Sequence, residues 1–156
     1  DSPNGLYDLL GGIISAHGMD HRQRGILVGA CAATLGDSYC ALSWGTKLAK
    51  AADEQTAAGV IKGSDEHVTD AERAMAAWAR KVVRDPNGTG AADVQQLRDA
   101  GFSDEQIFAI SVFLAFRIAF STVNDVLGLR PDVEFRVQAP QPVLDAVTFG
   151  RPIADP

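Results

Sequence analysis

The stretch LGDSYCALSWGT, residues 35–46, joins two apolar runs whose spacing is helical. The first run, 25–35, stops at Gly36, and the second, 37–50, starts at Asp37. Asp37 stands where a helix N-cap is expected, because its carboxylate can accept hydrogen bonds from the unpaired N–H groups of the first turn. The stretch therefore predicts a junction between two helices, and the rest of the chain continues the helical pattern on both sides.

Cys40 falls at about the third position of the helix that Asp37 is expected to cap. The helix dipole and the free N–H groups there favour an anion and lower the pKa of a thiol, as redox and nucleophilic cysteines require. Asp37, three residues earlier, acts in the opposite direction and raises that pKa. A free cysteine also packs well as a small buried apolar group. The position alone leaves both a reactive and a structural Cys40 open.

The composition is that of a soluble globular protein, with 156 residues of which 46% are apolar and 22% charged. The net charge of −6, without a dense Lys/Arg cluster, argues against nucleic acid as a partner. No apolar run is expected to approach the roughly 20 residues of a membrane span. No signal-peptide pattern, a basic segment followed by an apolar one, is seen. No membrane partner is therefore expected. Two cysteines, Cys31 and Cys40, do not make a disulfide scaffold, and a cytoplasmic location is expected.

The sequence predicts neither a metal site nor a cofactor. His17 and His21 have the His-x-x-x-His spacing, but the expected turn between them breaks the helix face, and no carboxylate pair completes the ligands that a metal would need. His17 and His21 flank a turn and are expected to be solvated or capping residues. Cys31 lies inside an apolar helical run, where it is expected to fill the core.

Periodicity and capping signals predict an all-α chain with no strand and no internal repeat. The expected helices are one from Leu6 that Gly18 ends, His21–Leu35, Asp37–Ala52, one from Asp53 or Gln55 to Ile61, one that Thr69 begins and that ends near Arg84, a short one from Ala91 to Ala100, and a long one from Ser103 to Gly128.

The long helix is apolar along most of its length, so it is expected to be either the central buried helix or an oligomer surface. Arg117, Asn124 and Asp125 are polar exceptions in it. We expect them to form a solvated stripe or an intersubunit contact. After Leu129 the chain is rich in proline, which predicts an extended arm over 129–156 with little helix, packed on a neighbour.

Two stretches of the chain resemble the carboxymuconolactone decarboxylase / alkylhydroperoxidase D-like (AhpD-like) superfamily, in its peroxidase-related branch. One is the junction LGDSYC at 35–40. The other is 71–86 followed by 94–107, which is similar to the family's arrangement of helix, turn, short helix, Ala-Gly-Phe-Ser/Thr-Asp and long helix. The resemblance implies a single AhpD-like helical bundle over 1–156 with 129–156 as a C-terminal arm, assembled as a homotrimer or homohexamer.

The resemblance also implies a site, because redox-active members carry a cysteine pair with a Glu and a His as proton relay. The first cysteine falls on Asp37 and the second on Cys40, and the residue before the second is Tyr39. The relay His falls on Trp44 and the relay Glu on about Gly25. The candidate site is therefore Cys40, Asp37, Tyr39 and Trp44, without the cysteine pair that the usual two-cysteine peroxidase route needs.

Three functions remain open at this point. The first is a peroxidase-related oxidoreductase in which Cys40 acts as a single peroxidatic thiol that an outside reductant restores. The second is an inactive oligomeric scaffold or binding protein. The third is a decarboxylase-like lyase on a small carboxylated or lactone substrate. It would use Asp37 as general base in a pocket walled by Tyr39 and Trp44, with His17 or His21 nearby.

Overall fold

The computed structural model describes residues 4–156, and within that range it contains helices and connecting loops but no strand. The helices are α1 (Asn4–Ala16), α2 (His21–Leu35), α3 (Ser38–Ala51), α4 (Glu54–Lys62), α5 (Asp70–Arg84), the 3₁₀ turn η1 (Pro86–Gly88), α6 (Ala91–Asp99), α7 (Asp104–Val126), α8 (Phe135–Gln138) and α9 (Gln141–Ala146). The all-α prediction is confirmed.

The junction between α2 and α3 forms as its sequence predicts. Gly36 ends α2 in the left-handed conformation with φ of 80°, which glycine adopts without steric cost. Asp37 then caps α3, since its Oδ1 accepts a hydrogen bond of 3.0 Å from the backbone N–H of Cys40. This cap fixes where Cys40 enters the first turn of α3.

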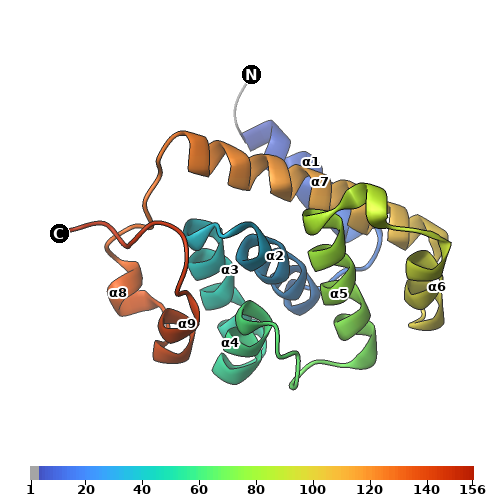
Figure 1. Cartoon of the computed structure of the whole chain (residues 1–156), viewed down its shortest axis with the longest axis horizontal. Helices are drawn as coiled ribbons and strands as arrows, with labels where there is room; N and C mark the ends of the chain where they lie inside the picture. The colour runs from blue at the N-terminus through green and yellow to red at the C-terminus, as the bar shows by residue number, and fades with distance from the viewer. Residues whose placement is uncertain (1–3) are drawn as a thin grey trace.

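Helix α2 lies at the centre of the molecule, packed against α3, α4, α5 and α7 (Figure 1). Its residues from Gly25 to Ala32 are buried. A Cβ added at Gly25 would lie 2.9 Å from the Cβ of Leu48, so a glycine is needed for α2 and α3 to approach this closely. Such close packing leaves no room for a side chain at Gly25, where the resemblance implied a relay Glu.

Partly buried ion pairs fix the helices around this centre. Arg22 of α2 binds Glu72 of α5 through its Nε at 2.6 Å, and Glu72 also accepts the backbone N–H of Thr69 in a capping box. Arg80 holds Asp65 in the loop between α4 and α5 and donates to the carbonyl of Val60.

Helix α7 runs across α2 and α1 and spans 23 residues (Figure 1). By length and composition it could cross a membrane, so the expectation that no apolar run approaches that length is wrong. One face packs into the core and carries Phe113 and Leu114, which are almost fully buried. The opposite face exposes Phe108 and Val126. The helix is thus buried on one side and open on the other, rather than wholly central.

The residues after Leu129 differ from the expected extended arm. They form α8 and α9, and α9 packs on α4 and α3 of its own chain. Pro142 lies in the first turn of α9, where a missing N–H costs nothing. Val143 is fully buried, and a Cβ at Gly45 would lie 2.8 Å from its Cγ1, so α9 docks closely on α3. The last ten residues are without helix, and there the carbonyl of Arg151 accepts a 2.7 Å hydrogen bond from Ser38.

Candidate functional site

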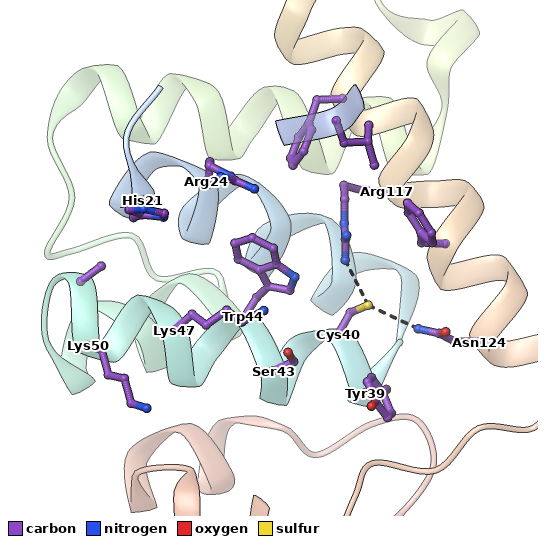
Figure 2. A pocket seen from close by; sticks show the side chains of 14 residues that line it. His21, Arg24, Tyr39, Cys40, Ser43, Trp44, Lys47, Lys50, Arg117 and Asn124 are labelled. Carbon is purple, nitrogen blue, oxygen red and sulfur yellow. Dashed lines mark hydrogen bonds between the residues drawn. The ribbon is translucent and has the colours of Figure 1, made fainter. Parts of the chain in front are cut away.

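A cavity of about 770 Å³ lies between α3 and the helices α1, α2 and α7. Figure 2 shows it from close by, with the side chains of α3 along one wall and those of α7 along another. Its polar and charged lining residues are His21, Arg24, Tyr39, Cys40, Ser43, Lys47, Lys50, Arg117 and Asn124, and its apolar ones are Leu10, Trp44, Ala51, Phe113 and Phe120. Three of the four predicted site residues, Cys40, Tyr39 and Trp44, line it.

The sulfur of Cys40 accepts two hydrogen bonds from α7. The Nη2 of Arg117 donates at 3.3 Å and the Nδ2 of Asn124 at 3.4 Å (Figure 2). Arg117 and Asn124 are about two turns apart on α7, so they extend from the same face of that helix. Both donors favour a thiolate over a thiol, because an anionic sulfur is the better acceptor.

Burial acts against these donors. The side chain of Cys40 is only 6% exposed, and burial raises the pKa of its thiol to about 11, with Arg117 lowering it and Asp37 raising it further. The sequence left open whether the helix start or Asp37 decides this pKa, and neither does so alone, since burial is the largest cause. At pH 7 the thiolate fraction is then on the order of 10⁻⁴. Cys31 is buried in the core as expected, and burial raises its pKa to about 12.

Asp37 has a structural role in the cap of α3. It is 1% exposed, its Oδ1 accepts the N–H of Cys40, and its Oδ2 accepts the Nδ2 of Asn124 at 3.4 Å. It is not among the residues that line the cavity. A carboxylate in this place is poorly positioned to take a proton from a molecule in the cavity.

Tyr39 lies in the cavity wall where α3 meets the C-terminal segment. Its hydroxyl donates to Oδ2 of Asp132 at 2.9 Å, and its ring packs edge-on against Phe135 with 6.2 Å between centroids. Tyr39 therefore holds the segment around α8 against the start of α3.

Trp44 stands at the middle of the cavity with cations around its ring (Figure 2). The Nζ of Lys47 lies 4.4 Å from the ring centroid, and the guanidinium carbons of Arg24 and Arg117 lie at 5.6 and 5.5 Å. An indole carries no titratable proton, so Trp44 cannot do the acid–base work of the relay His that the resemblance implied at this position.

The two histidines differ in their relation to the cavity. His21 lines it and is exposed, whereas His17 is not among the lining residues and its carbonyl accepts a hydrogen bond from Gln106. Within residues 4–156 no group of three or more His, Cys, Asp or Glu side chains is arranged to hold a metal ion.

The sequence interpretation missed the cationic residues of the site. Arg117 was expected in a solvated stripe or an intersubunit contact, and the solvated stripe is wrong, because Arg117 is 7% exposed and lines the cavity. The sequence did contain a signal for Arg117. An arginine within a long apolar helix is costly to bury, so its presence there indicates a polar or charged partner. Arg24 and Lys47 gave no comparable signal, because they lie in helices with other polar residues.

The chain was compared with known proteins. No family model matches it, and no curated protein matches it by sequence. Among solved structures, an uncharacterized peroxidase-related protein from Silicibacter sp. TM1040 superposes with a TM-score of 0.79 at 19% identity, over 86% of this chain and 72% of that one. An alkylhydroperoxidase AhpD core, an uncharacterized peroxidase-related protein from Ralstonia eutropha JMP134, superposes with a TM-score of 0.74 at 24% identity, over 89% of this chain and 78% of that one.

The chain has the AhpD-like fold. The resemblance that the two sequence stretches carry is thus confirmed at the level of the backbone. An AhpD-like fold does not fix the chemistry of its site, because one scaffold can hold different functional groups.

Proposed function

We propose that this AhpD-like protein is a peroxidase-related thiol oxidoreductase with a single redox cysteine, Cys40. The observation that carries the proposal is the pair of N–H donors on its sulfur, from Arg117 at 3.3 Å and Asn124 at 3.4 Å, at the wall of a cavity that can admit a substrate. A sulfur with a cation and an amide directed at it is prepared to carry negative charge.

The proposed reaction needs one cysteine and an outside reductant. The Cys40 thiolate attacks an oxygen of a hydroperoxide ROOH, the O–O bond breaks, and RO⁻ leaves and takes a proton from water to become ROH. The sulfur is oxidised to a sulfenic acid while the peroxide is reduced. An external thiol then displaces water to form a mixed disulfide, and a second thiol releases Cys40 as a thiol together with the external disulfide.

The high pKa of Cys40 supports a second candidate, a binding protein that has kept the fold and lost catalysis. Burial raises this pKa to about 11, so few molecules carry the thiolate near neutral pH. We do not propose a lyase with Asp37 as base, since Asp37 does not line the cavity, its Oδ1 accepts the cap hydrogen bond from Cys40, and its Oδ2 accepts one from Asn124 of α7.

Trapping of the sulfenic acid separates the two candidates. Protein treated with tert-butyl hydroperoxide in the presence of dimedone should carry the trap on Cys40, as seen by mass spectrometry, and should consume peroxide when dithiothreitol is supplied. Cys40→Ser should abolish both signals, and the matched Cys31→Ser should keep both. Peroxide consumption that survives in Cys40→Ser, or an unlabelled Cys40, contradicts the redox proposal and leaves the binding protein.

We also propose that the chain self-associates, as a homotrimer or homohexamer, and acts in the reducing cytoplasm, where external thiols are available. Support for assembly comes from the open face of α7, where Phe108 is 71% and Val126 75% exposed. Leu9 of the neighbouring α1 is 54% exposed. Covering these side chains with a second copy would remove apolar surface from water.

A further inference from the structure

The cavity lining has a charge opposite to that of the whole chain. The protein carries a net charge of −6, with 20 Asp and Glu against 14 Lys and Arg. Yet four lining residues are Lys or Arg and none is Asp or Glu. Several cations that lie together without a carboxylate repel one another, and this costs free energy. Such a cluster in an acidic protein therefore calls for an explanation.

These cations are not neutralised by the chain itself. Within the described residues, the side chains of Arg24, Lys47, Lys50 and Arg117 form no ion pair with a carboxylate, although six such pairs occur elsewhere. The effects of burial and of Arg117 lower the pKa of Arg24, and burial, Arg117 and Arg24 lower that of Lys47. Like charges thus face one another across the cavity.

Two buried N–H groups in this cluster also lack an acceptor. The Nε atoms of Arg24 and Arg117 are buried and have no hydrogen-bond partner among residues 4–156. Buried polar groups in proteins nearly always have partners, and those that do not commonly await a ligand, an ion or water. Arg117 is itself 93% buried, since only 7% of it is exposed.

The remaining lining is apolar. Leu10 of α1 and Phe113 and Phe120 of α7 line the cavity. The ring of Trp44 lies between Cys40 at one end and Lys47 and Lys50 at the other (Figure 2). Along α3, the rise of about 1.5 Å per residue separates Cys40 from Lys47 by roughly 10 Å. A ligand that satisfies this lining would carry a negative group at the lysine end and an apolar body that reaches toward the sulfur.

We infer that the cavity binds an organic anion, a carboxylate on an apolar body of about eight carbons. Arg24 and Lys47 would hold the carboxylate beside Trp44, and the body would lie against Phe113 and Phe120. Binding itself is independent of the redox chemistry. The substrate class rests on the proposed function. It is a hydroperoxide that carries such a carboxylate and directs its O–O bond at Cys40.

The test uses octanoate as the probe and isothermal titration calorimetry on the whole chain with Cys40→Ser, so that its result does not depend on thiol chemistry. Octanoate should bind, and the neutral octanamide should bind at least tenfold more weakly. Raising the salt concentration should weaken the binding of octanoate and leave the binding of octanamide unchanged, because salt screens only the charge of the carboxylate. Inorganic phosphate, an anion without an apolar body, should bind at least tenfold more weakly than octanoate.

The double variant Arg24→Gln/Lys47→Gln should lose at least tenfold in octanoate affinity. Lys62→Gln, on an exposed lysine of α4 outside the cavity, is the matched control and should bind as the parent does. Circular dichroism checks that both variants fold, and if the double variant does not, the comparison of octanoate with octanamide decides alone. Equal affinity for the amide, equal affinity for phosphate, or no octanoate binding at millimolar concentration overturns the inference. A bound octanoate with no sulfenic acid at Cys40 would keep the anion site and reject the redox proposal.

Discussion

The Nη2 of Arg117 lies 3.3 Å from the sulfur of Cys40, and this contact joins residues 77 positions apart in the chain. It connects the middle of α7 to the first turn of α3, across the wall of the cavity. Arg117 is the charged group that lowers the pKa of Cys40 most, so it opposes the effect of burial. The chemistry of this thiol therefore depends on how α7 is placed over α3.

Replacing Arg117 with Gln should raise the pKa of Cys40 above about 11, since the replacement removes the cation that favours the thiolate. Alkylation of Cys40 by iodoacetamide at pH 9, in a Cys31→Ser background, should slow by roughly a factor of ten for each unit of pKa gained. Arg98→Gln, at an exposed arginine in α6, should leave the rate unchanged. An unchanged rate in Arg117→Gln would show that the contact does not stabilise the thiolate.

Replacing Asp37 with Asn should have the opposite effect on the thiol. Asn caps a helix about as well as Asp, so stability should change by less than about 0.5 kcal/mol, while loss of the carboxylate lowers the pKa of Cys40. Alkylation at pH 9 should therefore speed up. Asp37→Ala removes the cap as well and should cost about 1 kcal/mol in the free energy of unfolding. If Asn and Ala behave alike in both measurements, the two roles of Asp37 are not separable.

The two buried thiols should make the fold less stable at alkaline pH. Their pKa values are raised to about 11 for Cys40 and about 12 for Cys31, whereas an unfolded cysteine has about 8.5. Below pH 8.5 both states keep their protons and stability is unaffected. Between pH 8.5 and the folded pKa only the unfolded chain ionises, so stability falls as pH rises, by roughly 1.4 kcal/mol per unit for each thiol.

Urea denaturation at pH 7, 8.5 and 10 under reducing conditions measures this effect. Cys31→Ser/Cys40→Ser removes both thiols, so its loss of stability between pH 8.5 and 10 should be smaller than that of the parent chain. Equal losses in the two proteins would mean that the thiols ionise alike in the folded and unfolded states.

Gly25→Ala should destabilise the protein by about 1–3 kcal/mol, because its Cβ would lie 2.9 Å from the Cβ of Leu48 and would push α2 away from α3. Gly11→Ala is the matched control. It lies inside α1 with no atom within 4 Å of the added Cβ, and there the higher helix propensity of Ala should stabilise by about 0.5–1 kcal/mol. Thermal unfolding of both variants gives the sign of each change in stability. An unchanged stability in Gly25→Ala would show that the helices can separate without cost.

Local signals explain which parts of the fold the sequence predicts well. Asp37, Thr69 and Ser103 each cap a helix at the expected place, because an N-cap needs only a short polar side chain next to the first turn. The C-terminal segment was harder, since prolines that predict an extended arm can also occupy the first turn of a helix, as Pro142 does in α9.

The site was predictable only where it follows from one local stretch. Cys40, Tyr39 and Trp44 all belong to α3 and line the cavity together, as their helical spacing implies. Arg24 and Arg117 come from α2 and α7, and their approach depends on how three helices cross, which no short sequence pattern encodes. The burial that raises the pKa of Cys40 has the same long-range origin.

The open face of α7 provides the test of self-association. Phe108, Ala115, Ala119 and Val126 recur at helical spacing and are exposed, so they form one apolar face. Phe108→Glu should place a charge in the proposed interface and shift the chain toward the monomer, as measured by size-exclusion chromatography with light scattering. Glu105→Lys, which changes charge on an exposed residue in the first turn of the same helix, should keep the parental mass. If the parent chain elutes as a monomer at high concentration, the proposal of assembly is wrong. If Phe108→Glu remains an oligomer, the interface lies elsewhere.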